Sequence, residues 1–266
     1  MINHKVKNMA KTNIGEAGKL FEKTTQEAQN DPNIVAFWLD GSRGKGIMSH
    51  AESDYDCMMI VKEEVLSEYK ERYEKIDPAI ELGVMTLEEF KDFAAWESDM
   101  NWYRYNYVWL KLPLVDKTGQ IQGMIKEKAT IPEDKRRKFI SEELDAYINQ
   151  VYRSLKCFRD GQNVGARLEA SESIMPLIKL IFAIHGRLRP YYKYYEWELK
   201  NQPLNKLSIS GEEFTNMMMA ILESADAGTQ KRLLNEIEMV TRKEGYGEVW
   251  DSWGDKLDWM KNFEEE

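Results

Sequence analysis

The turn Asp40-Gly41-Ser42-Arg43-Gly44-Lys45-Gly46 is followed by Asp54-Tyr55-Asp56 and the apolar run Cys57-Met58-Met59-Ile60-Val61, with eleven residues between Ser42 and Asp54. Residues 34–39 and 55–61 are short apolar runs, and each predicts a buried strand. The glycines between them predict a tight turn directly after the first strand. The sequence therefore places a glycine–serine turn at the end of the first predicted strand and a pair of acids at the start of the second.

Asp54 and Asp56 are separated by one residue, so on a strand their side chains point to the same face. An apolar strand normally excludes aspartate, because an unpaired buried carboxylate is costly. A divalent metal ion is the natural partner, and hard oxygen ligands suit Mg²⁺ or Mn²⁺. The next predicted strand, residues 79–85, carries Glu81 between apolar neighbours. Glu81 is the candidate third carboxylate of a two-metal site.

The glycine–serine turn has the composition of a phosphate site. Glycine allows the backbone to approach a ligand closely. The backbone N–H groups around Gly41 and the Ser42 hydroxyl can hold a phosphate, and Arg43 and Lys45 can add positive charge. Neither the GxxxxGK[ST] nor the GxGxxG pattern is matched. The turn therefore predicts a phosphate site of another type.

This order of glycine–serine, acid–x–acid on a strand and a lone acid on the next strand resembles the DNA polymerase beta-like nucleotidyltransferase superfamily. The resemblance covers residues 34–85, about a fifth of the chain. Residues 153–161 and 187–193 are similar to the helical domain of stand-alone bacterial members, which include relatives of antibiotic (aminoglycoside and lincosamide) nucleotidyltransferases.

The resemblance implies a role for each motif residue. Gly41 and Ser42 would hold the triphosphate, and Asp54 and Asp56 would bind the metal ions. Glu81 would complete the metal site and accept the acceptor proton, with Glu169 and Glu172 as alternative bases. Further phosphate or acceptor contacts are Lys156, Arg159 and Lys193, although lysines and arginines at such positions can equally be solvated helix faces.

Outward from the motif, the first half alternates helices (14–30, 65–73 and one beginning at Thr86) with strands. Residues 105–115 are predicted to be extended, and the aromatic cluster 102–109 fits a half-buried strand better than a stacking platform. From residue 133 onward the pattern is helical, with a buried central helix over 174–184 that ends at Arg189-Pro190. Further helices are expected near 212–223, 230–242 and 249–263, and His185 is expected to cap or pack a helix end.

The predicted fold is α+β. Residues 1–130 would form a nucleotidyltransferase domain with a small mixed sheet flanked by helices. Residues 131–266 would form a helical bundle that binds substrate or nucleotide, because Pro132 interrupts the pattern near the boundary.

Composition excludes several classes of protein. The 266 residues, 42% hydrophobic and 31% charged, are typical of a globular chain rather than a disordered one. No apolar run long enough to span a membrane is present, and the first residues lack the apolar region of a secretory signal. The two cysteines, Cys57 and Cys157, form no CxxC pair, which fits a reducing cytoplasm. Cys57 is expected to be a small core residue.

The net charge of −9 argues against a grip on long nucleic acid. Residues 153–193 nevertheless carry eight lysines and arginines against three acids, which suits a small polyanion such as a nucleoside triphosphate. The expected reaction transfers AMP from ATP to a hydroxyl of a small-molecule acceptor, for which a cationic aminoglycoside is one candidate. The alternatives are a protein or RNA acceptor, as in toxin–antitoxin systems, and a catalytically silent nucleotide-binding module. The sequence leaves a homodimer open.

Overall fold

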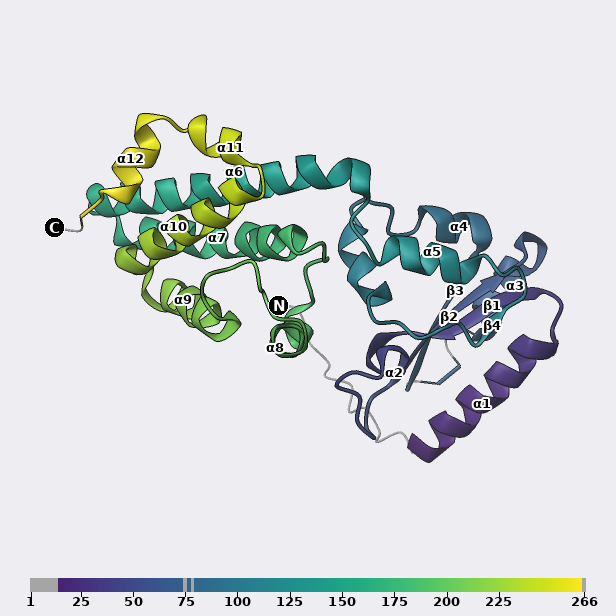
Figure 1. Ribbon diagram of the computed structural model, residues 1–266. Coiled ribbons are helices and arrows are strands. Elements are labelled where there is room, and N and C mark those ends of the chain that lie inside the picture. Colours follow the sequence, from purple (N-terminus) through teal and green to yellow (C-terminus); the bar gives the residue numbers. More distant parts are fainter. Residues whose placement is uncertain (1–13, 74–75, 78, 265–266) are drawn as a thin grey trace, which may run out of the picture. The chain divides into compact units, whose positions relative to one another are not determined.

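A computed structural model of the chain describes residues 14–73, 76–77 and 79–264 (Figure 1). The chain divides into two compact units, Met1–Thr130 and Ile131–Glu266. The first unit combines a sheet with helices and the second is helical, so the predicted α+β class is confirmed. Among the described residues, no helix is both long and apolar enough to cross a membrane.

The first unit is built on a four-stranded mixed sheet. Its strands are β1 (Ile34–Leu39), β2 (Tyr55–Val61), β3 (Ile80–Thr86) and β4 (Val115–Asp116). They lie in the order β3-β2-β1-β4. β1 runs antiparallel to β2 and β4, whereas β2 and β3 are parallel. The predicted bounds of the first two strands are those observed.

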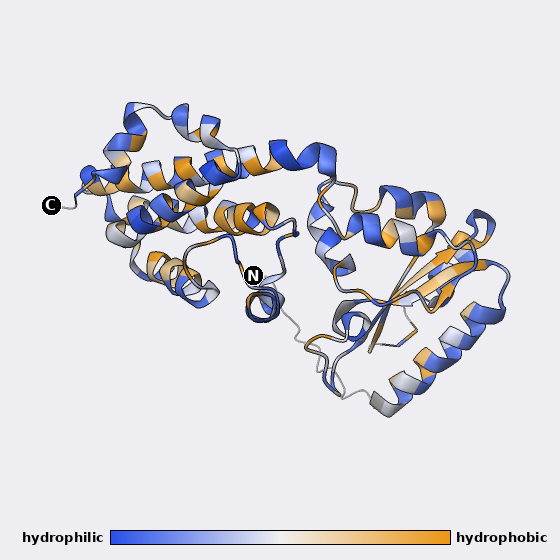
Figure 2. Ribbon diagram, viewed as in Figure 1, coloured by the Kyte–Doolittle hydropathy of each residue, from blue (hydrophilic) through white to orange (hydrophobic). Residues whose placement is uncertain are grey.

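Helices cover both faces of this sheet. They are α1 (Ile14–Asn30), α2 (Gly41–Lys45), α3 (Leu66–Tyr73), α4 (Leu87–Asp92) and α5 (Ile121–Lys128), together with the 3₁₀ segments η1 (Glu63–Val65) and η2 (Asn101–Tyr107). Phe37, Met59 and Leu82 point to the face that packs against α1 and α3. Trp38 and Met58 point to the opposite face, toward α4, α5 and η2. Strand alternation thus divides the apolar residues between two cores, and the apolar strands stand out in Figure 2.

The predicted extended segment over residues 105–115 is wrong. Residues 102–107 of the aromatic cluster lie in η2, and of the predicted segment only Val115 joins the sheet, as the first residue of β4. Tyr103 and Tyr107, four residues apart, pack their rings against each other at 5.8 Å on one side of η2. Aromatics at every second position mimic a strand, but here tertiary packing determines the backbone conformation.

The second unit begins with a hairpin of two long helices. Its helices are α6 (Glu133–Arg159), α7 (Asn163–Ile184), α8 (Tyr192–Asn201), α9 (Gly211–Ser224), α10 (Ala227–Lys243), α11 (Gly247–Asp251) and α12 (Asp255–Lys261). Leu144, Ile148 and Leu155 form the buried face of α6, and α7 is buried on most sides, as its sequence predicts.

Two predicted helix ends need correction. The buried helix α7 stops at Ile184 rather than at Arg189-Pro190, because Gly186 adopts a positive φ of 72° two residues later. The helix predicted over residues 249–263 is divided into α11 and α12 at Gly254, which also has a positive φ. His185 caps α7 as predicted: its Nδ1 lies 2.7 Å from the Ile181 carbonyl oxygen, and its Nε2 accepts a hydrogen bond from the Lys206 N–H.

Candidate functional site

The turn after β1 is organised by Asp40, a residue to which the sequence analysis gave no role. Asp40 is the N-cap of α2, and its carboxylate accepts a hydrogen bond from the Gly41 N–H at 2.9 Å. The Tyr103 hydroxyl donates to its other oxygen at 3.1 Å. Only 1% of Asp40 is exposed, and this burial raises the pKa of its carboxyl group. The hydrogen bond from Gly41 and the charge of Lys45 lower that pKa, but burial has the larger effect. An aspartate directly before a turn is an N-cap signal that could have revealed it.

Gly41 and Asp56 lie in direct contact. Gly41 has a positive φ of 57°, and a Cβ atom added to it would sit 1.8 Å from Oδ2 of Asp56. The Asp40 N–H also donates to the Asp56 carbonyl oxygen, which ties the turn to the start of β2. The fold therefore brings the glycine–serine turn and the Asp56 carboxylate together, across fourteen intervening residues.

Glu81 is the next neighbour of Asp56. The two residues are paired in the parallel register of β2 and β3, so their side chains leave the same face of the sheet. Asp56 is half-buried and Glu81 is exposed. Asp54 is exposed just before β2, and continued alternation places it on that face too. Among the described residues, no three His, Cys, Asp or Glu side chains lie close enough together to hold a metal ion.

The two cationic side chains of the turn, those of Arg43 and Lys45, donate to backbone carbonyls. Ser42 is buried. Arg43 donates from Nε to the carbonyls of Ser53 and Asp54 and from Nη2 to that of Ala51, at 2.8 to 3.1 Å. The guanidinium therefore holds the loop that leads into β2.

Lys45 is only 5% exposed, and its ammonium donates to the carbonyls of Tyr105, Asn106 and Val108. These three carbonyls lie at the end of η2 and just after it. In the structure Lys45 therefore anchors the end of η2. Its role in binding phosphate stays a prediction.

The other predicted contacts lie in the helical unit. Arg159 is ion-paired with Asp160 at 2.8 Å, and its guanidinium lies over the Trp259 ring. The ammonium groups of Lys156 and Lys193 lie over tyrosine rings at 5.4 and 5.6 Å. Of the alternative bases, Glu169 is ion-paired with Arg153 and Glu172 lines a cavity between α7, α8 and α9.

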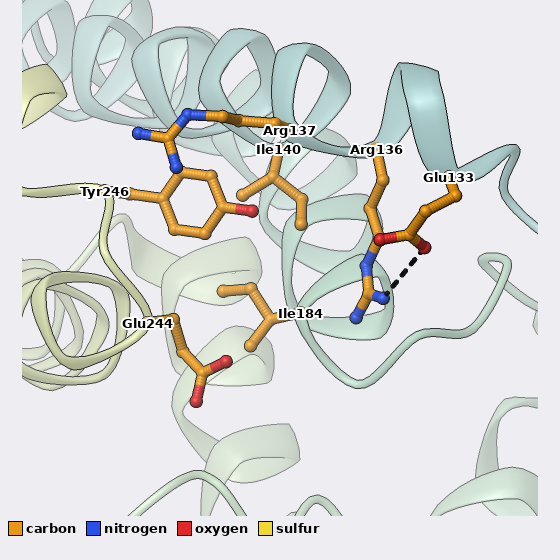
Figure 3. A pocket seen from close by; sticks show the side chains of 7 residues that line it. All are labelled: Glu133, Arg136, Arg137, Ile140, Ile184, Glu244 and Tyr246. Carbon is orange, nitrogen blue, oxygen red and sulfur yellow. Dashed lines mark ion pairs between the residues drawn. The ribbon is translucent and has the colours of Figure 1, made fainter.

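A smaller cavity of about 170 Å³ lies beside the first turn of α6. Figure 3 shows Arg136 turned toward Glu133, with which it forms an ion pair at 3.6 Å, and Arg137 above the ring of Tyr246. Arg137 is also ion-paired with Glu248. The lining carries two arginines and two glutamates, so its formal charges balance.

Comparison with solved structures finds a likeness in fold. No family model matches the chain, and no curated protein matches it significantly. A solved structure described as a nucleotidyltransferase-like protein from Exiguobacterium sibiricum 255-15 is similar, with a TM-score of 0.42 and 10% sequence identity. The match covers 94% of this chain and 87% of that one. Because the identity is so low, the reaction of this protein must be inferred from its own residues.

Proposed function

We propose that the chain is a metal-dependent nucleotidyltransferase that moves AMP from ATP to a hydroxyl of a small-molecule acceptor. One observation carries the proposal: the Asp56 carboxylate rests on Gly41, so a phosphate-type turn and a carboxylate on a strand meet at one point. Asp54 and Glu81 share the strand face of Asp56, which adds further oxygen ligands beside the turn.

The donor set fits magnesium. Mg²⁺ prefers oxygen ligands and is commonly held by one or two carboxylates together with substrate phosphates and water. Asp56 and Glu81, paired across β2 and β3, would supply two such carboxylates, and Asp54 stays a predicted further ligand. When bound, the ion neutralises the triphosphate and lowers the pKa of the acceptor hydroxyl.

In the proposed reaction the acceptor hydroxyl oxygen forms a bond to the α-phosphorus of ATP. The bond from that phosphorus to the bridging oxygen breaks, and pyrophosphate leaves with the electron pair. Glu81 accepts the hydroxyl proton. Gly41 and Ser42 orient the triphosphate. The protein backbone can approach the phosphates closely there, because residue 41 has no side chain. Arg43, Lys45, Lys156, Arg159 and Lys193 stay predicted contacts.

The acceptor is proposed from charge. A net charge of −9 attracts cations and repels long nucleic acid, so a polycationic antibiotic such as an aminoglycoside is the first candidate. Two free cysteines fit the reducing cytoplasm in which ATP is available.

The test is pyrophosphate release from ATP and Mg²⁺ across a panel of aminoglycosides and lincosamides. We expect release that requires one acceptor and falls by at least about 100-fold in Asp54→Asn/Asp56→Asn, because charge neutralisation at the phosphate is lost. Glu52→Gln, a matched exposed acid in the same loop, should retain the wild-type rate. Metal-dependent ATP binding without release for any member of the panel would contradict the small-molecule acceptor and favour a protein or RNA acceptor, or a silent binding module.

A further inference from the structure

The helical unit contains a larger cavity, of about 800 Å³, whose walls come from α7, α8 and α9. Most of the wall is apolar: Ile174, Met175 and Ile178 belong to α7, and Met218 and Leu222 belong to α9. Figure 2 shows the apolar bands along these helices. Pockets of about 300–1,000 Å³ hold small organic ligands, so the volume suits a molecule of that size.

Large apolar side chains at this cavity are left in water. Tyr192 is 61% exposed, Met219 48% and Leu222 44%, and all three line it. Exposed apolar side chains gathered at one concave place, rather than scattered singly, mark a binding site. Their contact with an apolar body would remove this surface from water.

The charged groups of the cavity are two carboxylates and one ammonium. Glu172 comes from α7, and Glu196 and Lys193 come from α8. Neither carboxylate has an ion-pair partner in the part of the chain that the structure describes. The Lys193 ammonium lies 5.6 Å from the centroid of the Tyr194 ring, a residue that does not line the cavity. The lining therefore has an excess of negative charge.

The aromatic and sulfur groups suit a positively charged ligand with an apolar body. Tyr192 and Tyr195 line the cavity, and tyrosine ring faces attract ammonium groups. The Arg189 guanidinium already lies over one face of the Tyr192 ring, 5.4 Å from its centroid, so a ligand would use the other face or the Tyr195 ring. Met175, Met218 and Met219 provide flexible, polarisable surface that adapts to ligands of irregular shape. An anionic ligand would meet the carboxylates unfavourably.

We propose that this cavity binds a small organic cation, an alkyl- or arylammonium whose apolar body contacts α7 and α9 and whose charge faces Glu172 and Glu196. Every lining residue belongs to the helical unit, so the site does not depend on the proposed nucleotidyl transfer.

The test is a fluorescence titration of the full-length protein with two dyes of similar size. Crystal violet is an apolar cation, and 8-anilinonaphthalene-1-sulfonate is an apolar anion. We expect saturable one-to-one binding of crystal violet and at least tenfold weaker binding of the anion. Glu172→Gln/Glu196→Gln should weaken binding of the cation by about tenfold and leave binding of the anion unchanged or improved. Glu212→Gln/Glu223→Gln, matched exposed acids of α9 that do not line the cavity, should leave both affinities unchanged.

A second variant separates binding in the cavity from nonspecific attraction to the surface. Ser171 is exposed and lines the cavity, so Ser171→Trp should fill its opening and abolish binding without unfolding α7. Asn216→Trp, an exposed position of α9 outside the lining, is the control. Equal affinity for both dyes, or unchanged affinity in Ser171→Trp, would overturn the proposal. So would a dimer in sedimentation velocity that Ser171→Trp dissociates, because a second copy would then occupy the surface.

Discussion

Gly41 illustrates how one missing side chain determines the site. Its positive φ and its contact with Asp56 are independent constraints, and only the second depends on Asp56. Gly119 has a similar φ of 69° with no atom within 4 Å of an added Cβ, so it isolates the first constraint. The pair of glycines therefore separates backbone strain from the contact at the site.

Gly41→Ala is expected to lose both stability and activity. The left-handed conformation costs about 1–2 kcal/mol for alanine, and displacement of the Asp56 carboxylate should lower pyrophosphate release by about 100-fold. Gly119→Ala should lower the free energy of unfolding by a similar amount and leave the rate of pyrophosphate release unchanged. Urea unfolding and pyrophosphate release measure the two effects, and a fully active Gly41→Ala would show that the contact is not needed.

His185 gives a pH dependence of known sign. Burial lowers its pKa below the ordinary 6.5, so the unfolded chain binds the extra proton more readily than the folded chain. The stability that neutral His185 contributes is present above about pH 6.5 and is lost as the pH falls below it. We expect the urea midpoint of the wild type to fall more between pH 7.5 and 5.5 than that of His185→Gln. His50→Gln, at an exposed loop position, should behave as the wild type does.

At the scale of elements, the end of η2 is held by the buried ammonium of Lys45. The Lys45 ammonium satisfies three carbonyls at the end of this segment. Lys45→Met should cost about 2–3 kcal/mol of unfolding free energy, because those carbonyls lose their donor inside the protein. Lys62→Met, at an exposed position, should change stability by less than about 0.5 kcal/mol. A Lys45→Met protein with unchanged stability but weakened ATP binding would instead support the role with phosphate predicted from the sequence.

The same element shows where sequence patterns succeed and fail. β1, β2 and α6 were predictable because each buries one periodic apolar face or a continuous apolar run. The capping box of Thr86 and Glu89 was predictable because it is local. η2 was not, since Arg104 within it donates to the carbonyls of Ala94, Glu127 and Thr130, which are distant in sequence. The contact of Gly41 with Asp56 likewise could not be predicted, because it joins residues from separate elements. The cap at Asp40 is local and could have been predicted from an aspartate directly before a turn.

At the scale of the whole molecule, the two compact units predict two unfolding events. Ile60 is buried in the sheet unit and Leu144 in the helical unit, each with 0% exposure. Ile60→Ala and Leu144→Ala should each lower the free energy of unfolding of their own unit by about 2–5 kcal/mol. Scanning calorimetry should resolve a broadened or double transition in which each substitution lowers one component. A single sharp transition that both substitutions shift equally would contradict two cooperative units.

Arg43 also governs whether the chain can be cut within the loop before β2. Its guanidinium holds the carbonyls of Ala51, Ser53 and Asp54, which flank the exposed Glu52. A glutamate-specific protease needs several residues on either side of the scissile bond to leave their positions and extend. Arg43 therefore protects the peptide bond after Glu52, and Arg43→Met would open this bond to a cleavage that separates the glycine–serine turn from its acids.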